Sequence, residues 1–263
     1  MSNGSSSPAT TDARAAAPDR AADERPAIVF LHATRLTGAQ WAAQVADLTP
    51  EFRCFTPDLP RHGTAADVPF DLDVAGRRVA ELIEREVGGR AVVVGLSLGG
   101  YVAMEVAARR PDLVSGLVVA GATAEPRGLR SVPYRGLARV FGSVPDRVLA
   151  RQQRWVFRYR YPAAISGPIL AEGFWFRGGA AAVRSLVGEE FKPRLASYPG
   201  PTLLINGQVD VLFRLTEPSF AAVATDPRRI TIRGAGHRSN LDRPRSFSAA
   251  VRAFAREIRT PGA

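Results

Sequence analysis

The sequence contains few of the features that indicate the cellular compartment of a protein or its association with a membrane. Its 263 residues include one cysteine, Cys54, which excludes an intrachain disulfide and favours a reducing compartment. No apolar run approaches the roughly 18 residues that a membrane-spanning helix needs. The first 24 residues are rich in Ser, Ala, Asp and Pro and lack the apolar block of a signal peptide. We therefore expect a cytoplasmic protein that does not associate with a membrane.

Lysine is also nearly absent, because the net charge of +10 comes from 34 arginines and the single Lys192. The charge is concentrated in residues 123–195, which hold thirteen basic and five acidic side chains. A basic segment can bind nucleic acid, but the sequence contains no nucleic-acid-binding module. We expect these side chains to form a solvated face or ion pairs with the rest of the chain. An alternative is that one or two arginines meet a substrate carboxylate.

Short apolar runs alternate with segments of helical periodicity, which predicts parallel βαβ units. The fold class is α/β, with a mostly parallel central sheet flanked by helices. A helix is expected over about 74–87 with Asp73 as its N-cap, another over 98–109 and a last one over 244–258. The predicted strands cover residues 27–31, 52–55, 91–94, 117–120, 202–206 and 229–232.

A long interruption separates the fourth strand from the fifth. A structureless loop of that length is improbable in a compact domain, and helical patterns occur near 132–141, 146–158 and 179–187. We predict a helical cap over residues 125–195, a core made of 26–124 and 196–263, and a disordered tail over 1–25. Ten of the 21 aromatic residues lie in the cap. A minority of them should line an apolar pocket, with Trp155, Phe157, Phe174 and Trp175 as candidate substrate contacts.

The central motif is Gly-Leu-Ser-Leu-Gly over residues 95–99, placed where an apolar strand changes into a helix. Such a sharp turn forces an unusual backbone angle at Ser97 and leaves no room for side chains at Gly95 and Gly99. The turn exposes the Ser97 hydroxyl. It also points the backbone N–H of Leu98 into the same space, at a helix start that favours a developing oxyanion.

A serine nucleophile needs a base, and the base needs a group that orients it. His237 follows the last predicted strand, which places it at the same sheet edge as Ser97, and Asp210 follows the strand before it. Glu125, at the end of the preceding strand, competes for the acid role. The remaining histidines, His32 and His62, are interpreted as loop residues that bond to the backbone, with His32 kept as a candidate substrate contact.

The order Ser97, Asp210, His237 together with this turn resembles the α/β-hydrolase superfamily over about residues 26–258. The likeness is strongest to its smaller, capped esterase and lactonase branch. The resemblance implies an oxyanion loop after His32, with the N–H of Thr34 as a second donor beside that of Leu98. It also matches residues 58–63 to a structural turn and the insertion to the family's cap.

The sequence departs from that family at three points. Ala33 and Arg61 stand where glycine is usual, and no strand pattern precedes residue 26, so six strands are expected instead of eight. The resulting hypothesis is a hydrolase of a carboxylic ester or lactone of a small, largely apolar substrate, working through a Ser-His-Asp triad without metal or cofactor.

The same three residues also suit other reactions. C–C bond hydrolysis, thioester cleavage, acyl transfer or perhydrolysis are alternatives, and so is a non-hydrolytic ligand-binding protein of the same fold. The expected partner is a small-molecule substrate, and binding to nucleic acid or to a membrane is not expected. Formation of a homodimer is a further alternative.

Overall fold

The computed structural model describes residues 23–259, so most of the predicted tail, residues 1–22, lies outside the described part. One six-stranded sheet has the order β2-β1-β3-β4-β5-β6, and each pairing is parallel. This agrees with the predicted fold class and strand number. The strands are β1 (Ala27–Leu31), β2 (Arg53–Phe55), β3 (Ala91–Leu96), β4 (Val114–Ala120), β5 (Thr202–Gly207) and β6 (Pro227–Ile232).

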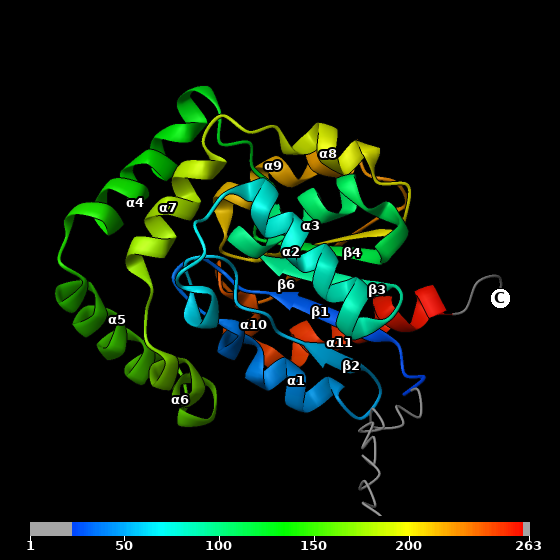
Figure 1. The fold of residues 1–263 in the computed structure, drawn as a ribbon, viewed down its shortest axis with the longest axis horizontal. Helices are drawn as coiled ribbons and strands as arrows, with labels where there is room; N and C mark the ends of the chain where they lie inside the picture. Colours follow the sequence, from blue (N-terminus) through cyan, green and yellow to red (C-terminus); the bar gives the residue numbers. More distant parts are fainter. Residues whose placement is uncertain (1–22, 260–263) are drawn as a thin grey trace, which may run out of the picture.

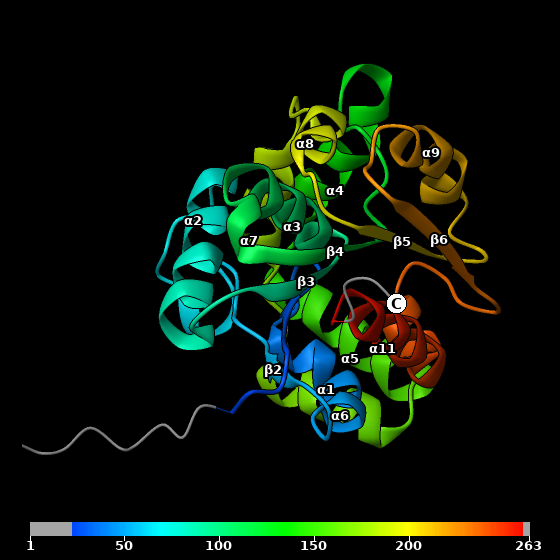
Figure 2. The same ribbon diagram turned by 90° about the vertical axis from the view of Figure 1, so that its right-hand side faces the viewer.

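The central strands are continuous apolar runs because both faces of the sheet are covered. In β3, Ala91 and Val93 pack into one apolar core, while Val92 and Val94 pack into a second core on the opposite face. Helices α2, α3 and α8 contribute to the first core and α1 and α11 to the second, as Figures 1 and 2 show. The core helices are α1 (Ala42–Leu48), α2 (Leu72–Leu82), α3 (Leu98–Arg109), α9 (Val211–Ala221), α10 (Ser239–Asp242) and α11 (Pro244–Arg259).

The chain between β4 and β5 forms a helical insertion. In Figure 1 its helices α4 to α7 lie together at one end of the molecule, on the left, whereas α8 lies beside α3. None of the helices within residues 23–259 is long and apolar enough to cross a bilayer. The insertion comprises α4 (Val132–Ser143), α5 (Asp146–Arg160), α6 (Ala163–Glu172), α7 (Phe176–Leu186) and α8 (Phe191–Ser197).

Two local predictions about helices were wrong: the N-cap of α2, and the set of helices in the insertion. The N-cap of α2 is Asp71 instead of Asp73, because the Asp71 carboxylate accepts the N–H groups of Asp73 and Val74 at 2.9 and 3.3 Å. The α-helical turns of that segment end at Leu82, and a π-helical turn continues to Val87. Helices α6 and α8 were missed. Both contain proline, which argues against a helix when the sequence is considered alone.

The strand order places a topological switch point between β1 and β3, since the chain leaves β1 toward β2 and then crosses back to β3. In parallel α/β sheets, ligands bind outside the carboxyl ends of the strands at such a point. Leu31 at the end of β1 pairs with Gly95 in β3. The loop after β1 and the turn after β3 therefore meet at this edge.

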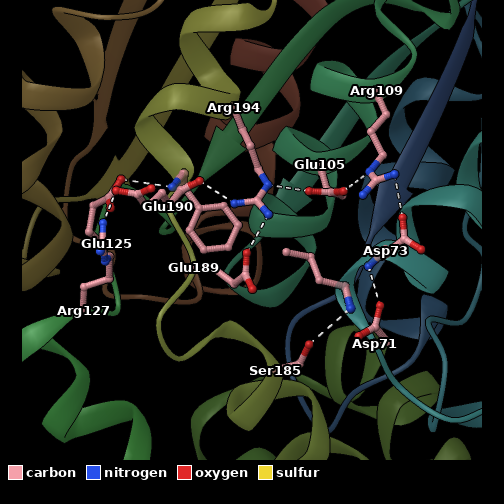
Figure 3. A network of polar contacts seen from close by, with 12 residues as sticks. Asp71, Asp73, Glu105, Arg109, Glu125, Arg127, Ser185, Glu189, Glu190 and Arg194 are labelled. Atoms are coloured by element: carbon pink, nitrogen blue, oxygen red, sulfur yellow. Dashed lines mark hydrogen bonds and ion pairs between the residues drawn. The ribbon is translucent and has the colours of Figure 1, made fainter.

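A network of ion pairs around the buried carboxylate of Glu105 ties α8 to α3 (Figure 3). Glu105 of α3 is 2% exposed and bonds both Arg109 and Arg194, the latter at 2.5 Å. Arg194 also pairs with Glu189 at 2.6 Å, and Arg109 reaches Asp73 at 2.7 Å. The network fixes α8 against α3 and so anchors the end of the insertion.

Candidate active site

Ser97 is the single residue between β3 and α3, and its backbone is strained. Its φ of 55° and ψ of −115° lie in a region that costs a non-glycine residue about 1–3 kcal/mol. The neighbouring backbones approach so closely that a Cβ on Gly95 would lie 2.1 Å from the Gly99 carbonyl oxygen. A Cβ on Gly99 would lie 2.0 Å from the oxygen of Leu31. The glycines thus permit a turn that holds the serine hydroxyl at the sheet edge.

Three side chains from separate parts of the chain meet at this edge. His237 Nε2 lies 3.0 Å from Ser97 Oγ, and His237 Nδ1 lies 2.8 Å from Asp210 Oδ2. Asp210 follows β5 and is 9% exposed, while His237 follows β6 with its side chain 39% exposed. Phe213 of α9 stacks on the imidazole at 5.0 Å between ring centroids. The carboxylate is therefore enclosed, whereas the imidazole faces an open side.

Two backbone N–H groups stand free beside the serine. Leu98 is the first residue of α3, so its N–H has no partner within the helix. Among the hydrogen bonds of residues 23–259, none uses the N–H of Leu98 or Thr34. Ala33, at the usual glycine position, donates its own N–H to Gln40 Oε1 at 2.8 Å, and its φ is not positive. The loop therefore keeps its form without a glycine there.

Arg61 is the other residue that stands where glycine is usual, and its backbone conformation costs free energy. Arg61 adopts a φ of 65°, in the left-handed region that glycine occupies most easily. The turn around it is held from several sides: the Arg61 N–H donates to the Ala65 carbonyl at 2.9 Å, and Asp58 accepts the N–H of Thr64 at 2.8 Å. These bonds hold the strained residue in place.

His32 and His62 bond to the backbone, and the structure leaves His32 no free nitrogen for a substrate. The ring of His32 is fully buried, with Nδ1 on the Ala33 carbonyl and Nε2 accepting the N–H of Leu59, both at 2.9 Å. His62 accepts the N–H of Arg35 at 3.1 Å. Burial lowers the pKa of His32 to about 4 and that of His62 to about 3, so both are neutral near pH 7.

Glu125, the other candidate for the acid, is used elsewhere. One of its carboxylate oxygens accepts the backbone N–H groups of Phe191 and Lys192 at 3.0 and 2.7 Å, at the start of α8. A carboxylate in that position satisfies orphan donors of the helix N-terminus. Glu125 therefore orients α8, as Figure 3 shows, while the carboxylate on His237 comes from Asp210.

A mostly apolar cavity of about 180 Å³ opens onto Ser97 and His237. Its walls come from the core helices α3 and α9 and from the insertion helices α4 and α7. The Tyr134 hydroxyl lies 2.6 Å from that of Tyr101, which donates to the Ala124 carbonyl, so a wall residue of α4 is held to the core. The lining residues are Thr34, Ser97, Leu98, Tyr101, Pro133, Tyr134, Leu137, Val183, Leu186, Leu212, Phe213 and His237.

The four aromatic residues expected to contact substrate do not line this cavity. Trp155 is 61% exposed and packs on Tyr159. Phe157 is fully buried and packs edge-on against Phe174. Phe174 and Trp175 instead line a separate, polar cavity of about 650 Å³. Composition identified the insertion as a source of wall residues. Which ring faces inward depends on the rotation of each helix, and the sequence carried no signal for that.

The comparisons with known proteins agree with this arrangement. The model of a family described as the alpha/beta hydrolase family matches residues 28–250. The chain belongs to the α/β-hydrolase family. A pimeloyl-[acyl-carrier protein] methyl ester esterase of Edwardsiella ictaluri is 31% identical to this α/β hydrolase over 242 residues, covering 87% of this chain and 92% of that protein.

Lactonases are among the relatives as well. The 3-oxoadipate enol-lactonase 1 of Acinetobacter baylyi is 26% identical over 242 residues, covering 90% of this α/β hydrolase and 91% of the lactonase. Among solved structures, an esterase of Thermogutta terrifontis with malate bound superposes with a TM-score of 0.75 at 25% identity, covering 89% of this chain and 91% of that one. This α/β hydrolase is therefore similar to capped esterases and enol-lactonases.

Proposed function

We propose that this α/β hydrolase cleaves a carboxylic ester or lactone, with Ser97 as the nucleophile. The observation that carries the proposal is the continuous relay from Asp210 through His237 to Ser97, with contacts of 2.8 and 3.0 Å. His237 Nε2 takes the proton from Oγ as the oxygen attacks the carbonyl, and the Asp210 carboxylate stabilises the imidazolium that forms. His237 is the base, Ser97 is the nucleophile, and the Asp210 carboxylate orients the base.

The free N–H groups of Leu98 and Thr34 donate hydrogen bonds to the negatively charged oxygen of the tetrahedral intermediate. Each such preorganised donor typically contributes roughly 10²–10³-fold to the rate. His237 then protonates the leaving oxygen, and the acyl group remains on Ser97 as an ester. A water molecule deprotonated by the same imidazole attacks that ester and releases the acid, which restores the serine. The cycle adds one water molecule across the bond that is cleaved, and no atom changes its oxidation state.

The cavity supports a small, largely apolar substrate group next to the reacting carbonyl. Its volume of about 180 Å³ is lined by Leu137, Val183, Leu186 and aromatic rings. A compact apolar wall excludes water from the acyl-enzyme and binds hydrocarbon by burial, at about 0.8 kcal/mol per CH₂ group. The relatives, an esterase of a methyl ester and an enol-lactonase, act on the same class of carbonyl group.

The decisive experiment replaces the nucleophile. Ser97→Ala should lower kcat on a short-chain p-nitrophenyl ester by roughly 10⁴-fold or more and abolish the mass increase produced by a fluorophosphonate. Ser143→Ala, at an exposed serine that ends α4, should change neither. Circular dichroism establishes that both variants are folded. Turnover or labelling that survives in the Ser97→Ala protein contradicts the proposal, and labelling of the natural protein without turnover on esters or lactones favours a ligand-binding role.

A further inference from the structure

Two arginines follow directly on residues of the proposed site. Arg35 comes after Thr34 in the loop that follows β1, and Arg238 comes after His237. Both side chains lie between these loops and the insertion. The guanidinium of Arg35 lies over the Phe141 ring at 5.4 Å, and that of Arg238 lies over Phe157 at 4.9 Å. Both cations are thus placed at the junction between the site and its cover.

Neither cation has a negatively charged partner. Among residues 23–259, no carboxylate lies within 4.0 Å of Arg35 or Arg238. Arg35 Nε and one terminal nitrogen of Arg238 are inaccessible to solvent and have no hydrogen-bond acceptor. Within the described part of the chain, the Arg35 side chain makes one hydrogen bond, a long one of 3.5 Å to Gln153. Asp242, four residues after Arg238, is bound instead by Arg160 and Tyr161 at 2.9 Å each.

The two charges also act on each other. Burial lowers the pKa of Arg35 to about 10, and the nearby charge of Arg238 adds to that lowering. With that pKa, Arg35 remains charged near pH 7. An enclosed cation whose donors lack acceptors costs free energy, and a second like charge increases that cost. The aromatic rings offset only part of it, about 0.5–2 kcal/mol for each cation. An anion between the guanidinium groups would accept hydrogen bonds from their accessible nitrogens and reduce the repulsion.

We propose that Arg35 and Arg238 form an anion subsite that holds a free carboxylate of the substrate. This inference rests on the proposed function and narrows it: the substrates are esters or lactones of acids that carry a second, ionised carboxylate. A guanidinium is planar and presents paired donors that match the two oxygens of a carboxylate. The apolar cavity, whose walls include neither arginine, would take the hydrocarbon portion of the same molecule.

The test uses matched pairs of esters. Monomethyl esters of dicarboxylic acids of increasing length are each compared with the methyl ester of the monocarboxylic acid of equal length, by methanol release. The natural protein should prefer the carboxylated member of at least one pair. Arg35→Gln and Arg238→Gln should each lower the ratio of the two kcat/KM values roughly 10–100-fold, the range expected for hydrogen bonds to a charged group. Arg158→Gln, which removes an exposed charge from α5, should leave the ratio unchanged.

A second measurement needs no variant. A free dicarboxylate of the preferred length should inhibit hydrolysis of the neutral ester competitively, and its diamide should not. Inhibition by inorganic phosphate but not by dicarboxylates would replace the carboxylate assignment with a phosphate one. Turnover of neutral esters without any carboxylate preference, or a preference that survives both substitutions, overturns the subsite alone. Absence of turnover on every ester together with absence of fluorophosphonate labelling would overturn the proposed function itself.

Discussion

Two pairs of arginines in this α/β hydrolase have opposite surroundings. Arg109 and Arg194 share the buried carboxylate of Glu105, and each has a further acidic partner. Arg35 and Arg238 lie over aromatic rings, and no carboxylate from residue 23 to residue 259 pairs with either of them. Charges of the first group hold α8 against α3, far from the serine. Charges of the second group follow directly on Thr34 and His237 in the sequence and have no ion-pair partner within residues 23–259, so ion pairing within the fold does not account for them.

The first way to break this comparison is to lower the pH, because two histidines beside Arg35 are buried in the neutral form. His62 accepts the N–H of Arg35, and the ring of His32 lies 5.0 Å from that of His62. Burial holds the pKa of His32 at about 4 and that of His62 at about 3, below the ordinary value of 6.5. Desolvation outweighs the hydrogen bonds to the Ala33 and Pro60 carbonyls and the charge of Asp58, all of which raise the pKa values.

Because the unfolded chain binds these protons first, stability is complete above pH 6.5 and falls as the pH decreases toward 4. At pH 5 each histidine should have removed about 2 kcal/mol from the free energy of unfolding, or about 4 kcal/mol for the two together. Urea unfolding at pH 7 and pH 5 measures the loss. His62→Gln keeps a donor and an acceptor but does not titrate, so its loss over this range should be about half as large. Equal midpoints at the two pH values would contradict the assignment of both rings as neutral.

The second way removes the shared carboxylate of the first region. Glu105→Ala leaves Arg194, whose side chain is 25% exposed, with one acidic partner fewer and opens space beside α3. Breaking a buried pair typically costs about 3–5 kcal/mol. The lower end, about 3 kcal/mol, is expected because Arg109 is half exposed and can turn to solvent. Thermal or urea unfolding measures it, and Glu105→Gln, which keeps the volume, should lose less. A Glu105→Ala protein as stable as the natural one would show that the network contributes nothing.

Which of these features the sequence predicts depends on how local their physical cause is. The strand runs of β1 and β3 and the turn at Ser97 are set by residues close in sequence, and they lie where the pattern indicated. The parallel alternation then brings Asp210 and His237 to the same edge as Ser97, because all three follow strands of one sheet. Long-range consequences of a repeated local pattern are thus predictable.

Helix rotation and side-chain pairing are different because they depend on contacts between distant segments. Nothing near Phe157 in the sequence indicates that it is buried and does not line the cavity, whereas Tyr134 does. Glu125 had the right position along the chain for the acid, yet α8 uses its carboxylate. The basic excess of the insertion was visible as composition. The unpartnered cations, Arg35 and Arg238, lie outside that segment and emerge only from the fold.

The last test sharpens the comparison by giving the two groups of arginines the same substitution. Methionine fills much of the space of an arginine stem and packs favourably against aromatic rings. Arg194→Met removes a partner from buried Glu105 and should cost about 2 kcal/mol. Arg238→Met removes an unpaired cation from Phe157 and Tyr161, so the lost cation–π contact is offset by the relieved desolvation. Its free energy of unfolding should change by at most about 0.5 kcal/mol, or increase. A loss as large as that of Arg194→Met would mean that Arg238 stabilises the folded protein. The two pairs of arginines would then differ in their contacts but not in their contribution to stability.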